Sequence, residues 1–205
     1  IKACRWWGEQ TRPWQSAVVA WEAHISSQLS SATKKRYGVS LAAADPYLSM
    51  YTIDKVDGKA ITSFITARQS QGALPATIRR DLTAISSVLE YAEAMDWRDG
   101  NPTLSKRRIL RERRDPITLP DYSDIETVIG CASPKFGALI RAALLTGCRQ
   151  NELVTASWRN FDPLAGTLTI IGKGNKLRVI ELSQQALQFF KSQNRTEKSS
   201  FIFCK

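Results

Sequence analysis

Apolar residues recur at intervals of three and four positions in the first half of the chain, and this period predicts amphipathic helices. The expected helices cover residues 15–29, 32–50, 59–71 and 75–95. Pro46 is expected to end or restart the second helix, because proline cannot donate the helical hydrogen bond. Gly72 is expected to close the third. Four helices joined by short connections predict a compact bundle over residues 15–97.

Helical spacing continues in the second half of the chain and then gives way to short β-like segments. We expect helices over residues 120–132, 137–146, 149–158 and 184–193. Between the last two, β-branched residues form two short segments around the turn Gly-Lys-Gly-Asn-Lys at 172–176, which predicts a β-hairpin. The predicted fold class is therefore mainly α with a small β-hairpin or sheet.

A basic stretch separates the two halves. Residues 98–115 contain seven Lys or Arg against three Asp or Glu. This composition suits a solvated surface segment and equally a strap that follows DNA phosphates. We expect a basic linker here, an irregular lead-in over residues 1–14 and a second domain over residues 116–205. The chain starts without methionine and stops just after an apolar run, so we expect both ends to be truncated.

Composition narrows the class of partner. The 205 residues carry 29 Lys and Arg against 19 Asp and Glu, a net charge of +10, which favours a polyanion but does not by itself identify nucleic acid. No apolar run reaches the roughly 18 residues of a membrane span and no signal peptide is present, so we expect a cytoplasmic protein. The four cysteines form no CxxC or Cys/His cluster, and we expect no metal, disulfide framework or cofactor.

Residues 144–153, LLTGCRQNEL, place an arginine directly after a Thr-Gly break between two predicted helices. Arg149 at the start of a helix could bind an anion through its guanidinium and the positive end of the helix dipole. Glu152, three residues later, could hold the guanidinium in place. A routine surface ion pair is the simpler interpretation, and these residues alone leave both open.

The stretch TGCRQNELVTASWRNFDPLAGTLTIIGKGNKLRVIEL, residues 146–182, resembles the catalytic core of tyrosine recombinases, the phage integrase family. The resemblance rests on the Thr-Gly turn, the Gly-Lys-Gly tip, the strand after it, and Arg149, Glu152, Leu153, Trp158 and Asp162, in the family's order and spacing. It implies a four-helix, SAM-like core-binding domain joined by the linker to a truncated α+β catalytic domain. It also implies a bacterial or phage-encoded integrase of a phage or other mobile element, which binds double-stranded DNA between its two domains.

The resemblance implies roles for individual residues. Arg149 would bind the scissile phosphate as a catalytic residue, with Glu152 supporting it. Lys173, between two glycines, would protonate the departing 5′-oxygen, with Lys176 as its rival. Both lysines could also be solvated turn residues. A phosphate-binding P-loop is excluded, because five residues instead of four separate Gly166 from Gly172, and a glycine follows Lys173.

Family members complete the pocket after the hairpin with a His-x-x-Arg pair, a further His or Trp, and a tyrosine nucleophile. Here all five tyrosines precede Arg149, and the only histidine, His24, lies in the first predicted helix, where we interpret it as a packing or surface residue. The 3′-phosphotyrosyl intermediate requires the tyrosine. We therefore expect this chain to be a fragment that binds DNA without cleaving it, monomeric in solution, while the full-length protein would form a tetramer on DNA.

Eight basic residues and one threonine outside the motif are candidate DNA contacts, although each could equally be an ordinary solvent-facing residue. They are Lys34, Lys35, Arg36, Thr77, Arg79, Arg80, Lys106, Arg107 and Arg108. Two other function classes stay open at this point. One is a non-catalytic DNA-binding regulator or excision accessory on the same scaffold. The other, a metal-dependent nuclease, is disfavoured because the sequence has no clustered carboxylates or histidines.

Overall fold

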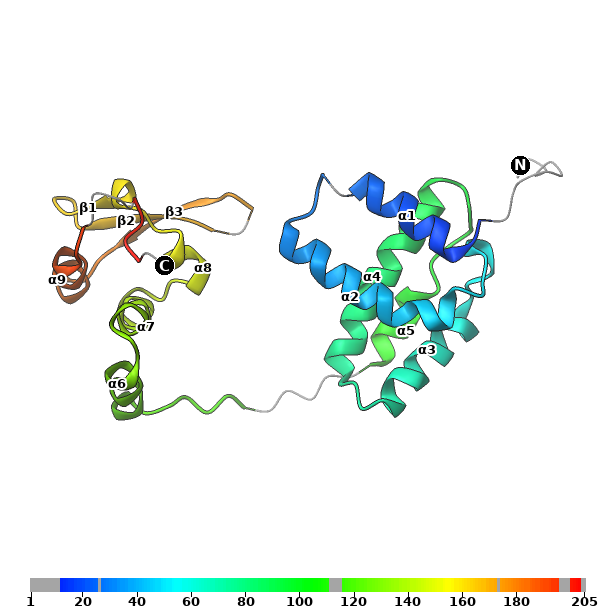
Figure 1. Ribbon diagram of the computed structural model, residues 1–205, viewed down its shortest axis with the longest axis horizontal. Coiled ribbons are helices and arrows are strands. Elements are labelled where there is room, and N and C mark those ends of the chain that lie inside the picture. Colours follow the sequence, from blue (N-terminus) through cyan, green and yellow to red (C-terminus); the bar gives the residue numbers. More distant parts are fainter. Residues whose placement is uncertain (1–11, 26, 111–115, 173, 196–199, 204–205) are drawn as a thin grey trace. The chain divides into compact units, whose positions relative to one another are not determined.

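The computed structural model describes residues 12–25, 27–110, 116–172, 174–195 and 200–203, apart from the side chains of residues 108 and 109. The chain divides into two compact units, Ile1–Asp115 and Pro116–Lys205, shown in Figure 1. Each unit has its own hydrophobic core. The units are therefore described one at a time.

The first unit is a helical bundle built around one central helix. Its elements are α1 (Trp14–Ile25), α2 (Ser31–Leu48), the short 3-10 helix η1 (Ile53–Lys55), α3 (Gly58–Ser70), α4 (Pro75–Ala94) and α5 (Thr103–Ile109). Helix α4 packs against α1, α2, α3 and α5. Its predicted apolar stripe, from Ile78 to Ala92, is fully buried. The 3.6-residue period therefore located the bundle core correctly.

Local capping residues set the starts of these helices. The side chain of Ser30 accepts the amide of Thr33 at the start of α2, and Asp57 accepts two amides at the start of α3. Gly72 follows α3 in the left-handed region, with φ of 77°. The prediction for Pro46 was wrong, because α2 continues through it to Leu48. The proline removes one helical hydrogen bond, and the helix continues for only two residues beyond it.

Residues 98–110 differ from the expected extended linker, because they pack on the first unit. Helix α5 contacts α3 and α4. The side chain of Arg98 is buried, and its guanidinium donates to the carbonyls of Ile53 at 2.9 Å, Val56 at 3.1 Å and Gly100 at 2.8 Å. Burial lowers the pKa of Arg98 from its ordinary value. These three carbonyls give the buried guanidinium the hydrogen-bond acceptors that it needs away from water. Residues 111–115 of the predicted linker lie outside the described residues.

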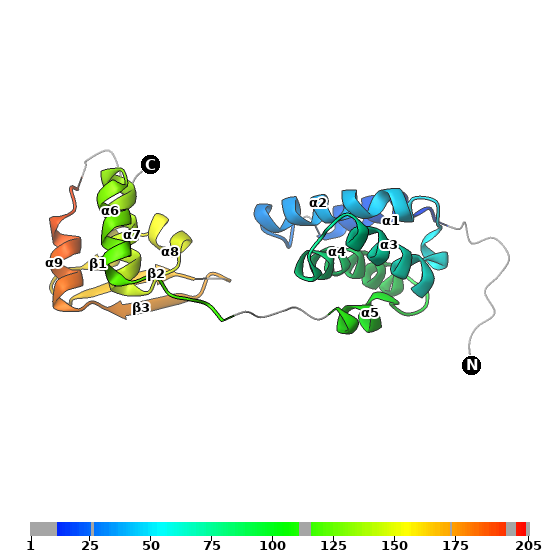
Figure 2. The same cartoon turned by 90° about the horizontal axis from the view of Figure 1, so that it is seen from below.

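The second unit is a small sheet with helices. Its elements are α6 (Tyr122–Cys131), α7 (Pro134–Thr146), α8 (Gln150–Val154), the 3-10 helix η2 (Trp158–Asn160), β1 (Phe161–Asp162), β2 (Thr167–Ile171), β3 (Leu177–Glu181) and α9 (Gln184–Ser192). The strands form an antiparallel sheet in the order β1-β2-β3. Figure 2 shows α6, α7 and α8 on the same side of this sheet. The predicted fold class, mainly α with a small sheet, is confirmed.

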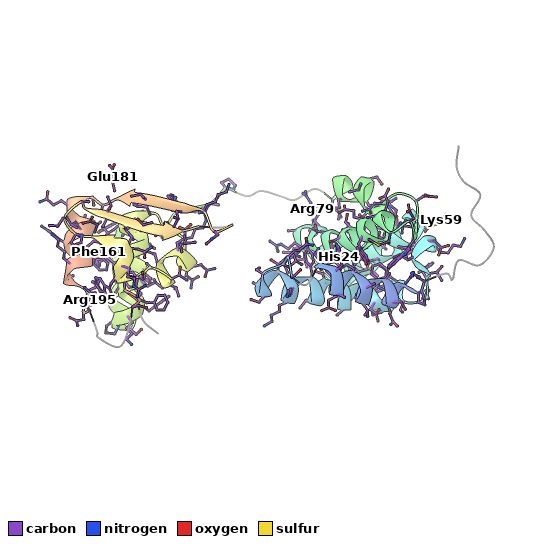
Figure 3. All side chains as sticks on the ribbon, turned by 90° about the horizontal axis from the view of Figure 1, so that it is seen from above. His24, Lys59, Arg79, Phe161, Glu181 and Arg195 are labelled. Carbon is purple, nitrogen blue, oxygen red and sulfur yellow. The ribbon has the colours of Figure 1, made fainter. Side chains whose placement is uncertain are left out.

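Alternation along the strands separates a core face from an outer face. Leu168 and Ile170 of β2 are buried against the helices. Phe161, paired with Leu168, lies on the same face, because directly opposed residues of neighbouring strands share a face. Figure 3 shows Phe161 and Glu181 on opposite sides of the sheet. The sheet thus covers the core with one face only, as is usual for antiparallel sheets.

The predicted helix over residues 149–158 was too long, since α8 ends at Val154. The backbone beyond it pairs with residues 200–202 instead. The amide of Trp158 donates to the carbonyl of Ser200 at 2.9 Å, and the amide of Ile202 donates to the carbonyl of Ala156 at 2.9 Å. These tertiary hydrogen bonds replace the helical ones that the local pattern predicted.

Candidate functional site

A tight turn between α7 and α8 places Arg149. Gly147 adopts φ of 64°, in the left-handed region that glycine enters without steric cost, and its amide donates to the carbonyl of Ala143. The amide of Cys148 donates to the hydroxyl of Thr146 at 3.3 Å. The chain then enters α8 with Arg149 as the N-cap residue, one position before the first helical residue. The Thr-Gly break therefore presents this arginine at the start of α8.

Glu152 is the centre of a charged cluster. Its side chain is only 4% exposed, and its carboxylate accepts hydrogen bonds from two residues. Arg149 donates its backbone amide to Oε2 at 2.9 Å and its Nη1 to Oε1 at 3.0 Å. Arg178 of β3 donates Nη2 to Oε2 at 3.1 Å. The hydrogen bond from the backbone amide of Arg149 lowers the pKa of Glu152, and both guanidinium groups add to this shift, although burial opposes it. The carboxylate is therefore ionised at neutral pH.

The two arginines keep much of their surface open. The side chain of Arg149 is 75% exposed and that of Arg178 is 50% exposed. Both line an open pocket between α8 and the β2–β3 hairpin, whose walls are Arg149, Gln150, Asn151, Glu152, Thr155, Ile171, Gly172, Lys176, Leu177 and Arg178. The lining of this pocket holds two guanidinium groups and the ammonium of Lys176 against one carboxylate, that of Glu152. The pocket therefore has an excess of positive charge and hydrogen-bond donors that suit an anion.

The hairpin lysines are placed only in part. Lys173 lies outside the described residues. Lys176 is exposed and lines the pocket with Arg149. Its carbonyl accepts the amide of Gly172 at 2.7 Å, which closes the turn, and Gly174 has φ of 77°. The structure thus brings Lys176 to the pocket of Arg149, and the choice between the two lysines stays a prediction.

Sequence reasoning missed Arg178. This residue pairs with Ile170, which is buried on the core face of β2. Residue alternation along β3 therefore gives Arg178 a core-facing position, between the outward residues Leu177 and Val179. A charged residue at a core-facing strand position is unusual and indicates a buried partner. That signal was present in the sequence once the register of the hairpin was known.

The candidate DNA contacts of the first unit gather partly at one place. Lys34 and Lys35 are exposed near the start of α2, and Arg80 is exposed near the start of α4. The Nη1 atom of Arg36 donates to the carbonyl of Arg80 at 3.4 Å, so these two helix ends are neighbours. The guanidinium of Arg36 also lies 4.5 Å from the centre of the Tyr37 ring. A basic surface therefore covers the first turns of α2 and α4.

The other predicted DNA contacts have less exposed side chains or lie outside the basic surface of α2 and α4. Thr77 and Arg79 on α4 are half-buried, and Figure 3 labels Arg79. Lys106 packs its aliphatic chain near Gly58 at the start of α3, where a Cβ would lie 3.7 Å from its Cε atom. Arg107 is half-buried on α5, and the side chain of Arg108 lies outside the described residues. Their contact with DNA stays a prediction.

Other residues considered from the sequence have simple surroundings. His24 is exposed on α1 and contacts the ring of Tyr91, with centroids 5.0 Å apart (Figure 3). Cys131 is exposed and Cys148 is buried, while the remaining two cysteines lie outside the described residues. Within the described ranges, no group of three or more His, Cys, Asp or Glu could hold a metal ion. No helix in that part of the chain is long and apolar enough to cross a membrane.

Comparison with known proteins adds evidence from outside the site. Residues 123–205 match the model of the phage integrase family. Tyrosine recombinase XerC of Xanthomonas campestris pv. campestris (strain B100) is 27% identical over 198 residues, which cover 90% of this chain and 60% of the relative. Tyrosine recombinase XerD of Pasteurella multocida (strain Pm70) is 26% identical over 176 residues, covering 80% and 58%. The chain thus spans about 60% of the length of these curated relatives.

Solved structures share the fold of both units. A lambda integrase dimer bound to a COC′ core site matches with a TM-score of 0.74 at 16% identity, covering 94% of this chain and 57% of that chain. A lambda integrase tetramer bound to a Holliday junction matches with a TM-score of 0.75 at 16% identity, covering 94% and 60%. The Tn1549 transposon integrase in complex with circular intermediate DNA matches with a TM-score of 0.68 at 17% identity, covering 92% and 71%. At these identities the likeness establishes the fold alone.

Proposed function

Since the chain belongs to the tyrosine recombinase, or phage integrase, family, we propose that the pocket at Arg149 binds a phosphodiester of double-stranded DNA. The whole protein is then a site-specific recombinase of a phage or other mobile element. The observation that carries this proposal is the Arg149–Glu152 pair, which lies at the edge of an open pocket lined by two further cationic side chains.

Arg149 is suited to hold the phosphate. Its guanidinium has five N–H donors, of which one is bonded to Glu152, so donors remain for two non-bridging phosphate oxygens. Glu152 keeps this group at one position from its buried site on α8. Fixed positive charge of this kind stabilises the charge that develops on the phosphoryl oxygens during transfer.

The hairpin lysines supply the proton in this scheme. When a tyrosine attacks the phosphorus atom, a 3′-phosphotyrosyl ester forms and the 5′-oxygen of the DNA leaves. Lys173, between its two glycines, is the first candidate to give that oxygen a proton, and Lys176 is the second. The exposed position of Lys176 in the pocket supports a lysine from this hairpin acting at the phosphate.

The 205-residue chain has no tyrosine after Arg149. We therefore expect it to bind DNA and to form no covalent adduct, since the ester step needs the nucleophile. The basic ends of α2 and α4 would contact DNA phosphates through Lys34, Lys35 and Arg80. We expect this chain to be monomeric, with tetramers formed by the full-length protein on DNA.

A non-catalytic DNA-binding regulator or excision accessory is the second candidate. It uses the same cationic pocket, and it requires that the native protein lack the tyrosine nucleophile. Both functions require binding to DNA. They differ in whether the native protein, at its full length, forms a covalent bond with DNA.

Fluorescence anisotropy with a labelled DNA duplex at low salt tests the shared part of the proposal. Arg149→Gln should weaken binding by about tenfold, the effect of losing one charge-assisted contact. Arg195→Gln removes an equal charge from the same unit outside the pocket and should have a smaller effect. Absence of binding by the wild-type chain, or equal losses in both variants, would refute the proposal. A suicide-substrate assay that trapped a covalent adduct on this chain would overturn the predicted inactivity.

A further inference from the structure

Arg178 lies where a strand would normally place an apolar core residue. Its pairing partner Ile170 is only 2% exposed, and the outward neighbours Leu177 and Val179 are 70% and 63% exposed. A charge on the core face of a sheet is costly unless a partner is present. Arg178 has this partner in Glu152, at 3.1 Å. Half of the Arg178 side chain stays exposed, and the contact with Glu152 holds its guanidinium at one position.

This contact joins two separate elements of the second unit. Glu152 belongs to α8 and Arg178 to β3, 26 residues later in the chain. The Oε1 atom of Glu152 also lies 3.5 Å from the position that a Cβ would take at Gly172. The carboxylate is thus fixed from the helix side by Arg149 and from the hairpin side by Arg178. The hairpin turn that carries Lys176 is thereby tied to the helix that Arg149 caps.

Arg178 also sets the net charge of the cluster that it forms with Arg149 and Glu152. Arg149 and Glu152 alone form a pair with no net charge, and such a pair attracts an anion only weakly. Arg178 adds a second guanidinium to the same carboxylate, so the three groups together carry one uncompensated positive charge. Coulomb attraction to a phosphate at short range is correspondingly stronger.

We propose that Arg178 is a positioning residue for phosphodiester binding. It shares Glu152 with Arg149, links the β2–β3 hairpin to α8, and leaves the cluster with net positive charge toward the pocket. This inference rests on the proposed function. The alternative is that Arg178 forms an isolated ion pair at the rim of the pocket and affects DNA only through its own charge.

The first test follows the Glu152 carboxyl group by NMR titration in the folded chain without DNA. Arg178→Gln should raise the pKa of Glu152 toward its ordinary value, because one donor and one nearby charge are lost. Lys176→Gln is the matched control: it removes an equal charge from the same pocket, while the contacts described for Glu152 come from Arg149 and Arg178. It should leave that pKa unchanged. Arg178→Lys keeps the positive charge on a shorter side chain, and it should give Glu152 a pKa between those of the wild type and Arg178→Gln. This variant replaces Arg178→Gln if the latter does not fold.

The second test is a double-mutant cycle on DNA affinity. Arg178→Gln alone should weaken binding of a duplex by about fivefold, and by less than about twofold when Arg149 is already glutamine, because coupled residues are not additive. Equal losses in both backgrounds, with an unchanged pKa of Glu152, would overturn the inference. A wild-type chain that bound no duplex would refute the proposed function and the phosphate part of this inference. The Glu152 titration would still decide whether Arg178 holds the carboxylate.

Discussion

Replacing Arg98 with methionine is expected to destabilise the first unit by about 3 kcal/mol. Arg98 is 5% exposed, and its guanidinium bonds three carbonyls at 2.8 to 3.1 Å. Methionine fills a similar volume without offering a donor. The variant therefore tests whether the three bonds, rather than the bulk of the side chain, hold η1 and the segment after α4 together.

The magnitude follows from two opposing contributions. Hydrogen bonds from a charged donor contribute roughly 2 kcal/mol each, which gives an upper bound of about 6 kcal/mol for three bonds. Burying the guanidinium costs several kcal/mol of hydration, which the methionine variant no longer loses. About half of the upper bound is expected to remain, because the carbonyls of Ile53, Val56 and Gly100 are left without this donor.

Urea unfolding measures the effect. A Trp158→Phe background removes the one tryptophan in the sequence of the second unit, so that fluorescence reports on the first unit, whose sequence holds the other five. With a slope near 2 kcal/mol per molar urea, the midpoint should fall by about 1.5 M. Arg107→Met is the matched control, since Arg107 is half-buried on α5 in the same basic stretch. Midpoints that shifted equally in the two variants would refute the argument from carbonyl satisfaction.

Three further predictions concern other contacts. Folding lowers the pKa of Glu152 from 4.5, so its stabilisation is present above that value and is lost as the pH falls through the folded pKa. The second unit of the wild type should therefore lose stability more steeply on acidification than Glu152→Gln, and parallel urea midpoints, followed by NMR signals of that unit, would contradict this. Ser183 caps α9 by accepting the amide of Ala186, so Ser183→Ala should cost about 1 kcal/mol in the same assay, with Ser192→Ala at the other end of α9 as the control. Arg80→Gln should weaken DNA binding and lower the slope of log affinity against log salt by about one, and an unchanged slope would exclude a phosphate contact.

Local features of the sequence predicted much of the architecture. They also predicted one of the two ion pairs of the charged cluster, the one between Arg149 and Glu152. The apolar stripe of α4 was visible because a helix repeats its buried face at 3.6-residue intervals. Gly147 marked the break before Arg149, because glycine adopts the left-handed conformation that ends a helix. The Arg149–Glu152 contact spans only three residues, so its two partners are neighbours in any chain that forms this turn.

The remaining features depended on partners far apart in the chain, which no local pattern specifies. Arg98 was predicted to lie in a basic linker, and it is buried because its guanidinium donates to carbonyls 42 and 45 residues earlier in the chain. The helix after Arg149 stops early because residues 200–202 supply alternative hydrogen bonds. Arg178 meets Glu152 only when the hairpin register and the packing of α8 are both set. Periodicity and turn chemistry thus determine the elements and their caps, whereas buried charges find their partners only through tertiary packing.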